Sequence, residues 1–321
     1  MKCIEVPKKY AERTIKLLRA LRIMDNEHII TRKDDHVLIP VKKEPPMNNE
    51  LSSIPMRLII CSPPVKKKKE VKVPAHDIIG DIAVVRENVL EYMSREEIVE
   101  ALRTTYPRIR TIYLKKGTEG VFRVAELELL WGVDDPSTIH KEYGLRLKVD
   151  LRRAYYNPRL SEEHRRIAEN AGDGESIFDL FAGIGGFAIH IASLHKATVL
   201  MNDLNPYAVR LGVENILLNK KRIKGTIIPL RIDARLALKY FRTESFDRVI
   251  ANIPRSTHLF EKIYWYLLRS KGMLHLYFLS SISERDEFIK RYFARWKLTG
   301  IRKVIDYAPY VFIWRADLVK P

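Results

Sequence analysis

The spacing of apolar and polar residues predicts segments of different character along the chain. Residues 1–43 begin with an apolar strand (MKCIEV), continue into an amphipathic helix that opens at Pro7, and end in a hairpin that turns at residues 33–35. Residues 44–70 lose this periodicity and carry proline pairs and a run of four lysines. We predict a small α/β module over residues 1–43. A linker over 44–70 follows, with one short buried strand (MRLIIC) and a solvated lysine run.

Residues 71–150 predict a second module, of α+β type. The run IIGDIAVV is typical of a strand, and Ser94 with Glu97 forms the pattern of a capping box at the start of a helix. Two further apolar runs and a hairpin that turns at Tyr143 and Gly144 complete this module.

Residues 151–321 alternate strands and helices, which is typical of a mostly parallel sheet. One of the predicted helices spans residues 256–269. The last two predicted strands, residues 297–308 and 310–318, lie close enough in sequence to pair antiparallel. The chain is therefore expected to be an α/β protein in which a Rossmann-like domain is preceded by two small modules.

A glycine-rich turn follows the first strand of this alternation. The sequence IFDLFAGIGGF places Asp179 at the end of an apolar strand and Gly183 and Gly185 in the turn that opens a helix. Glycines there let backbone N–H groups approach a ligand without interference from Cβ atoms. Asp203 closes the next strand, where a carboxylate accepts the hydroxyls of a ribose. Together these features predict a nucleoside cofactor.

The ends of later strands narrow the choice of nucleoside. A dinucleotide site favours a third glycine, and Ala188 stands at that position. A third strand ends in Asp233, well placed for the amino group of an adenine, and a fourth ends in Asn252-Ile253-Pro254. This series resembles the class I S-adenosylmethionine-dependent methyltransferases, whose strands end in that order along the cofactor. The resemblance implies S-adenosylmethionine and a mostly parallel seven-stranded sheet.

The amino-acid composition indicates what kind of partner the protein binds besides the cofactor. The chain of 321 residues carries a formal net charge of +17 and has a pI of about 9.7. Such an excess favours a polyanionic partner, most simply nucleic acid. The alternative is a charged, solvated surface of the thermophile type, which a chain without glutamine also fits.

The cysteines and the hydropathy pattern indicate the compartment. Cys3 and Cys61 have no metal-ligand spacing, so we expect a reducing interior without disulfides and a site without metal. No apolar run reaches membrane-spanning length and no signal peptide opens the chain. We therefore expect a protein of the cytoplasm with no membrane partner. We also predict a monomer, although no feature of the sequence decides the oligomeric state.

Polar residues outside the glycine turn have two interpretations. Taken alone, Arg123 is typical of a surface or salt-bridged residue, and Glu163 merely complements the amino end of a helix. The sequence segments around them, with others along the chain, are more informative about function. These segments are GVFRVAELELLWG, IHKEYGLRLKVDL, YYNPRLSEEHRRIA, DLFAGIGGFAIHIA, NDLNPYAV, NIP and YAPY. In this order they resemble the archaeal and eukaryotic tRNA (guanine-N1)-methyltransferases that modify guanosine 37, beside the anticodon. The likeness runs from about residue 71 to the C-terminus. Residues 1–43 are similar, more loosely, to the family's tRNA-elbow-binding domain.

The resemblance implies a reaction and the residues for it. N1 of guanine carries a proton, so a base must accept this proton as the methyl bond forms, and charge then grows on O6. The family's general base falls on Glu163 and its O6-stabilising arginine on Arg123, while Asn252 would hydrogen-bond the guanine. The further substrate residues implied are Tyr155, Arg159 and Pro254. The cofactor residues implied are Asp179, Phe181, Gly183, Gly185, Asp203, Leu204, Asp233, Ala234 and Asn252. The implied partner is tRNA, bound at its anticodon loop and its elbow.

Other functions stay open at this point. The wybutosine-pathway aminocarboxypropyl transferase shares the cofactor and much of the catalytic half, and a tRNA-binding protein without activity or another Rossmann enzyme remains an alternative. Some archaeal members of the methyltransferase family also methylate 4-demethylwyosine. Arg255 rather than an aromatic residue follows Pro254, which argues against methylation of an exocyclic amino group. The sequence departs from the family pattern at Ile253, Gly186 and His164, and His164 adjoins the expected base.

Overall fold

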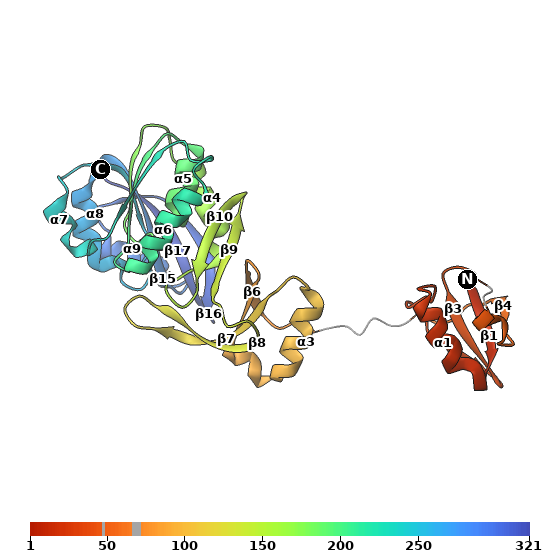
Figure 1. The fold of residues 1–321 in the computed structure, drawn as a ribbon. Coiled ribbons are helices and arrows are strands. Elements are labelled where there is room, and N and C mark those ends of the chain that lie inside the picture. The colour runs from red at the N-terminus through yellow and green to blue at the C-terminus, as the bar shows by residue number, and fades with distance from the viewer. Residues whose placement is uncertain (47–48, 66–71) are drawn as a thin grey trace. The chain divides into compact units, whose positions relative to one another are not determined.

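The chain folds into two compact units, Met1–Val71 and Lys72–Pro321. This computed structural model describes residues 1–46, 49–65 and 72–321, and the four consecutive lysines fall outside them (Figure 1). No helix in these described ranges is long and apolar enough to cross a membrane.

The first unit is a four-stranded sheet covered by one long helix. The strands lie in the order β2-β3-β1-β4, and β1 pairs antiparallel with both β3 and β4. Their bounds are β1 Lys2–Pro7, β2 Thr31–Lys33, β3 His36–Val41 and β4 Arg57–Ile60. The helices are η1 Lys8–Tyr10, α1 Ala11–Ala20 and α2 Asn49–Ser52. Leu18 of α1 packs in the core with Ile4, Val6 and Ile39, which confirms the expected amphipathic helix after Pro7.

Two expectations for this unit are corrected. The short strand of residues 57–60 is present, but it is an edge strand and Ile60 is 90% exposed, so it is not buried. Cys3 and Cys61 form a disulfide, with Cα atoms 5.8 Å apart, although we expected none. The pairing of β1 with β4 brings together residues that are far apart in sequence. Sequence spacing alone does not reveal such a contact.

The second unit begins with a four-stranded sheet in the order β5-β6-β7-β8. Its strands are β5 His76–Ile79, β6 Ile82–Arg86, β7 Thr111–Glu119 and β8 Val124–Gly132. The run expected as one strand is a hairpin, because the backbone turns at Gly80, whose φ is +59°. The helices are η2 Glu87–Glu91 and α3 Arg95–Thr105, and α3 starts with the expected capping box of Ser94 and Glu97.

A separate hairpin precedes the large sheet. It consists of β9 Ser137–Glu142 and β10 Leu145–Asp150. Tyr143 and Gly144, at its turn, have φ values of +46° and +82°, as the sequence pattern predicted. Asn215 and Asn219 of α6 (Pro206–Leu218 and its C-cap) bond to the backbone of β10 and fix the hairpin to the large domain.

The large domain is built on a seven-stranded sheet in the order β13-β12-β11-β14-β15-β17-β16. Strands β11 to β15 pair in parallel, whereas β17 pairs antiparallel with β15 and β16. This confirms the mostly parallel sheet and its antiparallel finish. The bounds are β11 Ser176–Asp179, β12 Thr198–Asn202, β13 Thr226–Leu230, β14 Phe246–Ala251, β15 Leu268–Ser280, β16 Lys297–Ala308 and β17 Val311–Val319.

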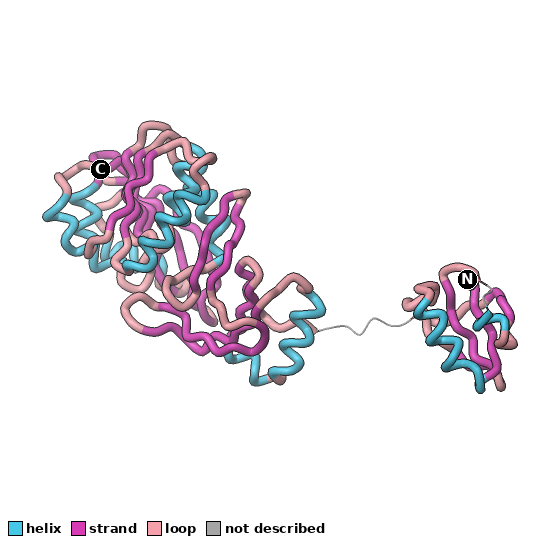
Figure 2. Tube along the Cα trace, in the orientation of Figure 1, coloured by secondary structure: helices cyan, strands magenta, loops and turns pink. Residues whose placement is uncertain are grey.

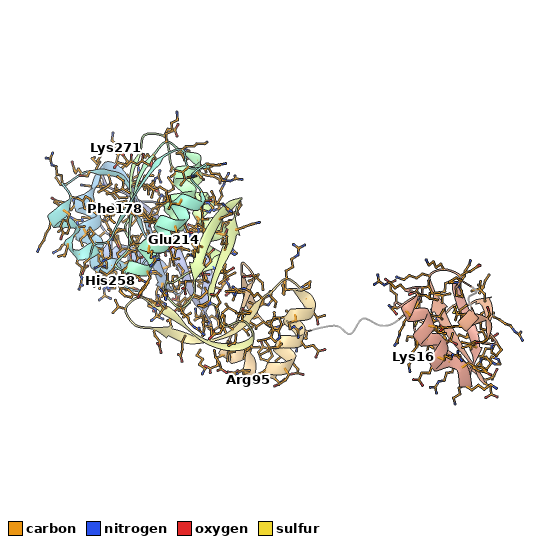
Figure 3. The ribbon with its side chains drawn as sticks, viewed as in Figure 1. Lys16, Arg95, Phe178, Glu214, His258 and Lys271 are labelled. Carbon is orange, nitrogen blue, oxygen red and sulfur yellow. A yellow bond between two sulfur atoms is a disulfide. The ribbon has the colours of Figure 1, made fainter. Side chains whose placement is uncertain are left out.

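Helices cover both faces of this sheet (Figure 2). Besides α6, they are η3 Pro158–Leu160, α4 Ser161–Glu169, α5 Gly186–Leu194, η4 Ala234–Leu236, α7 Ala237–Tyr240, η5 Thr257–Phe260, α8 Glu261–Leu267 and α9 Arg285–Tyr292. The helix expected over residues 256–269 ends at Leu267, because the chain enters the long strand β15 there. Phe178 (Figure 3) lies in the core between the sheet and α8, together with Tyr264 and Leu276. The carboxyl ends of β11, β12 and β14 are left uncovered for a site.

Candidate active site

The glycine turn between β11 and α5 has the backbone geometry that its sequence requires. Gly183 has a φ of +55°, and Gly185, the N-cap of α5, has a φ of +91°. Asp203 holds the turn from the next strand: its carboxylate accepts the N–H of Gly183 at 2.8 Å and that of Asn205 at 2.9 Å. The turn is therefore fixed in shape by a carboxylate that also faces the cleft.

A cleft with a volume of about 480 Å³ lies at the carboxyl ends of β11, β12 and β14. Ten of the residues predicted from the sequence line it: Arg123, Tyr155, Phe181, Gly183, Asp203, Leu204, Asp233, Ala234, Asn252 and Pro254. They come from β-strand ends, from the turn before β8 and from the segment before η3. The structure thus brings together residues that are up to 131 positions apart (Arg123 to Pro254).

A second cavity of about 490 Å³ adjoins the cleft. The two share walls formed by Arg123, Tyr155, Asn157 and Tyr307, among others. Beyond these walls the second cavity is lined by four cationic side chains, Arg86, Lys115, Lys116 and Arg159, and by three acidic ones, Asp77, Glu87 and Asp306. Burial, and to a lesser extent Arg86, lowers the pKa of Lys115. Cationic side chains outnumber acidic ones in the lining of this cavity, which favours an anionic or hydrogen-bond-accepting ligand.

Arg123 stands on the wall common to both cavities. Its guanidinium lies 5.7 Å from the ring centre of Tyr155, and its backbone has a φ of +52°. Across the wall, Arg255 donates to the hydroxyl of Tyr307 at 2.5 Å and thereby lowers the pKa of that tyrosine. Arg255 itself lines neither cavity, but both guanidinium groups interact with Tyr307, which lines both, and Arg123 provides a positive environment for an oxygen on which charge develops.

The acidic residues of the cleft lie in three different environments. Asp179 is fully buried behind the cleft with neither carboxylate oxygen hydrogen-bonded, and burial, with a contribution from Asp203, raises its pKa well above the usual value. Burial also raises the pKa of Asp203. Hydrogen bonds from Arg235 instead hold the pKa of Asp233 below its usual value. Within the described residues neither Asp179 nor Asp203 has an ion-pair partner, so the cleft suits a ligand with positive charge.

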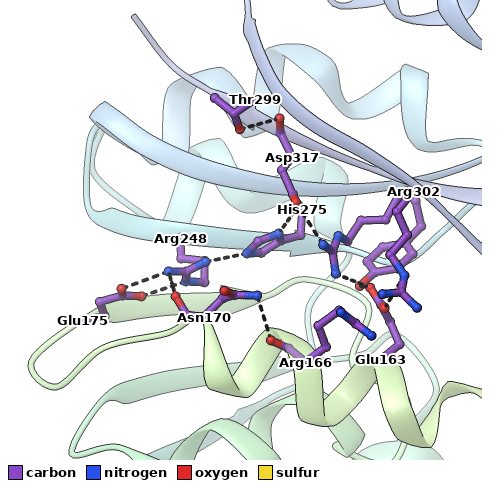
Figure 4. Close-up of polar contacts among 11 residues, drawn as sticks. Glu163, Arg166, Asn170, Glu175, Arg248, His275, Thr299, Arg302 and Asp317 are labelled. Carbon is purple, nitrogen blue, oxygen red and sulfur yellow. Dashed lines mark hydrogen bonds and ion pairs between the residues drawn. The ribbon is translucent and has the colours of Figure 1, made fainter.

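Glu163 is not among the described residues that line either cavity. It is 2% exposed, and its Oε1 atom accepts hydrogen bonds from Arg315 at 2.6 Å and from the Tyr277 hydroxyl at 2.9 Å. From Arg315 a chain of polar contacts continues through the interior of the domain (Figure 4). Its further members are Asp317, His275, Arg248 and Glu175. The structure therefore leaves Glu163 out of the described lining of both cavities, whereas Arg123 lines both.

Asp179 and Gly185 also lie behind the described lining of the cleft rather than in it, and Arg159 lines only the second cavity, where it pairs with Asp77 at 2.9 Å. The side chains of Glu163 and His164 point in different directions from α4, and His164 is the one that lines the cleft.

A model of the TRM5/TYW2 methyltransferase domain matches residues 138–300. The chain belongs to this family. Models of the tRNA methyltransferase 5 N-terminal domain and of the TYW2 N-terminal domain match residues 3–48 and 65–135.

Three curated relatives show the range of the TRM5/TYW2 family. The tRNA (guanine(37)-N(1))-methyltransferase Trm5b of Pyrococcus abyssi is 30% identical, over 95% of each chain. The tRNA(Phe) (4-demethylwyosine(37)-C(7)) aminocarboxypropyltransferase of Methanocaldococcus jannaschii is 31% identical, over 73% of this chain and 93% of its own. The tRNA (guanine(37)-N(1))/4-demethylwyosine(37)-methyltransferase Taw22 of Nanoarchaeum equitans is 29% identical, over 73% of each chain.

Solved structures of the TRM5/TYW2 family have the same fold. The complex of aTrm5 with tRNALeu is 26% identical, with a TM-score of 0.70 over all of both chains. Trm5 of Methanocaldococcus jannaschii in complex with adenosine is 26% identical, with a TM-score of 0.64 over 100% of this chain and 99% of its own.

Sequence reasoning missed several residues of this family site. Tyr307 lines both cavities, and its signal was the terminal YAPY block, to which no role was given. His164, noted only as a departure, is held by a buried cluster: its Nδ1 atom lies 2.8 Å from Glu142, which also contacts His190 and Tyr156 at 2.9 and 2.5 Å.

Among the described residues, Glu142, His164 and His190 have the spacing of a metal site. One carboxylate oxygen and two imidazole nitrogens of these residues lie within 4.8 Å of one another. Burial alone would raise the pKa of Glu142. The charge and hydrogen bond of His164, with bonds from His190 and Tyr156, outweigh burial and hold the pKa far below its usual value. Three hydrogen-bond donors thus satisfy the carboxylate, and the cluster ties β9 to α4 and α5.

We expect Gly186→Ala to lower the free energy of unfolding by about 1–3 kcal/mol, the usual cost of overpacking. A Cβ atom on Gly186 would lie 2.4 Å from Cε1 of His164, which Glu142 holds in place. Denaturant unfolding measures the effect. Gly117→Ala is the control, because its Cβ would meet nothing closer than 3.9 Å. Equal stability losses in the two variants would contradict the tight contact at Gly186.

Proposed function

We propose that the protein transfers a methyl group from S-adenosylmethionine to N1 of guanosine 37 in tRNA. The observation that carries this proposal is the position of Arg123 on the wall shared by the cofactor cleft and the second cavity. The similarity to Trm5b supports it over the full length of the chain. We assign residues 1–43 to the tRNA elbow, 44–70 to a linker, 71–150 to part of the active site and 151–321 to cofactor binding, in a monomer of the cytoplasm.

The cleft at the glycine turn fits S-adenosylmethionine. Asp203 faces the cleft from the end of β12, where it can accept the ribose hydroxyls, and Asp233 lies at the adenine end. Buried Asp179, whose oxygens lack hydrogen-bond partners and whose pKa burial raises, would ionise more readily beside a cationic ligand. Phe181, Leu204 and Ala234 supply apolar walls. When bound, the cofactor supplies an electrophilic methyl group on a sulfonium.

The second cavity is our proposed entrance for the target base. Tyr155 and Tyr307 offer aromatic faces for guanine, and Arg123 is placed to stabilise negative charge on O6. Asn252 and Pro254, at the end of β14, line the adjoining cofactor cleft, with which this cavity shares the wall of Arg123, Tyr155 and Tyr307. Arg159 braces this wall through its ion pair with Asp77. Methyl transfer then requires only that the N1 proton be removed.

We keep Glu163 as the proposed acceptor of that proton, with a condition that the structure adds. Leu160, the N-cap of α4, and His164 within α4 line the cleft, but the carboxylate of Glu163 is bonded to Arg315. The proposal therefore requires Glu163 to leave Arg315 when the target base binds.

An aminocarboxypropyl transfer is the second candidate, because a relative with that activity is 31% identical. That relative covers 73% of this chain, whereas Trm5b of Pyrococcus abyssi covers 95%. The additional match includes the first unit, which favours the methyltransferase.

The test is nucleoside analysis of tRNA after incubation with the protein and S-adenosylmethionine. We expect 1-methylguanosine from a transcript with guanosine 37 and none from the same transcript with adenosine 37. A tRNA carrying 4-demethylwyosine shows whether the intermediate is a second substrate, as for Taw22. A much heavier aminocarboxypropyl adduct, or no adduct at all, would refute the proposal.

A further inference from the structure

The connection between β7 and β8 is a tight turn of four residues, Gly120 to Arg123. It is closed by a hydrogen bond of 3.2 Å from the N–H of Arg123 to the carbonyl of Gly120. Both of these residues have positive φ, +63° for Gly120 and +52° for Arg123. The shape of the turn is therefore fixed by the backbone, and the two residues between its ends project at the tip.

Those two residues are apolar and exposed. Val121 is 84% and Phe122 is 40% exposed, and both line the mouth of the cofactor cleft. Of the large apolar side chains that line the two cavities in the described chain, Val121 is the most exposed, and Leu259 follows at 72%. Arg123 of the same turn lines both cavities, and the second of them carries several cationic side chains. An apolar tip beside such a cavity suits a ligand that has both phosphates and flat apolar surfaces.

The proposed reaction requires that the target base be held outside the anticodon-loop stack, which an apolar tip can do. N1 of guanine is inaccessible in a stacked loop, so the target base must leave the stack. Proteins that distort nucleic acids insert apolar wedges such as Phe between bases to hold the distorted form. Arg123 belongs to the same turn and faces the cavity where the extruded base would lie.

We propose that Val121 and Phe122 enter the anticodon-loop stack at the gap left by the target base, with unpaired RNA bases as their ligand. The inference rests on the proposed function and assigns the wedge to one turn. Insertion of the tip and contact of Arg123 with the base are then one movement, because the closed turn carries both. The wedge residues stabilise the extruded base and touch neither the methyl group nor the proton.

The double variant Val121→Ser/Phe122→Ala tests the wedge, with Ile282→Ala as control, an apolar side chain 65% exposed on the same unit and outside both cavities. The first readout is the fluorescence of 2-aminopurine placed at position 37 of the tRNA, with S-adenosylhomocysteine present. We expect the fluorescence to rise when the tRNA binds to wild type or to the control variant, because the base leaves the stack. We expect no such rise with the double variant.

The second readout is single-turnover methylation of two substrates. On ordinary tRNA the double variant should be slower than wild type by on the order of tenfold to a hundredfold, the scale of an unstacking cost. On tRNA with abasic sites at positions 36 and 38, where no stack must be broken, its rate should return to about that of wild type.

Three results would overturn the wedge. One is a fluorescence rise in the double variant that equals that of wild type. Another is a ratio of the variant rate to the wild-type rate that is the same on ordinary tRNA and on abasic tRNA. The third is an equal loss on both tRNAs with weaker S-adenosylmethionine binding by calorimetry, which would make the tip a cover for the cofactor. If wild type forms no 1-methylguanosine, the proposed function fails, whereas the fluorescence readout still decides the wedge.

Discussion

Replacement of Arg123 with alanine is expected to slow methyl transfer by about 10²–10³-fold, the usual cost of removing one donor to a developing oxyanion. The guanidinium stands on the wall common to both cavities, where charge on O6 of the target guanine would appear. Its contribution is larger in the transition state than in the bound substrate, because O6 becomes more negative as N1 loses its proton. We therefore expect the loss in the rate constant and not in tRNA affinity.

Single-turnover kinetics with saturating tRNA measures this effect. Arg123→Lys keeps the charge but not the planar donor pair, and should recover only part of the rate. Arg242→Ala removes an exposed cation of the same unit that lines neither cavity and serves as the control. If Arg123→Ala and Arg242→Ala weaken tRNA binding equally without a change in rate, Arg123 is only part of the basic surface.

Replacement of Glu163 with glutamine is expected to slow transfer by roughly 10²–10⁴-fold if this carboxylate accepts the N1 proton. The same change removes the charge that faces buried Arg315 at 2.6 Å. Loss of one partner of a buried ion pair costs about 3–5 kcal/mol of stability, and less where a hydrogen bond remains. A slow Glu163→Gln variant alone would therefore not separate catalysis from folding.

Arg315→Gln makes that separation. It breaks the same ion pair from the other side and leaves the Glu163 carboxylate in place, freed from its main partner. We expect both variants to unfold at lower denaturant concentration, but only Glu163→Gln to lose the rate. Equal losses of stability and of rate in the two variants would make Glu163 a structural residue, and another group would have to accept the proton.

Local patterns in the sequence predicted the elements and the cofactor edge of the site. The capping box at Ser94, the hairpin at Tyr143 and the glycine turn at Gly185 each depend on residues within one turn of the chain. Such patterns are decided by local backbone geometry, which the sequence states directly. The ends of β11, β12 and β14 then meet because parallel strands place their carboxyl ends together.

Long-range contacts could not be predicted in this way. The bridge between Cys3 and Cys61 depends on the pairing of β1 with β4, and the burial of Glu163 depends on Arg315, which is 152 residues away. Neither partner carries a local signal. Neighbouring positions on a helix differ by about 100° in direction, so the sequence alone could not tell which of Glu163 and His164 faces the cleft.

Asp203 in the wall of the cleft and Asp179 behind it have a consequence for turnover. The methyl donor carries a positive charge at sulfur, and the thioether left after transfer does not. Asp179 and Asp203, whose pKa values are raised in the absence of a cation, ionise more readily beside the donor than beside the product. On the proposed function, methyl transfer removes the positive charge that attracts these carboxyl groups to the cofactor. The reaction thereby promotes the exchange of spent cofactor for fresh donor.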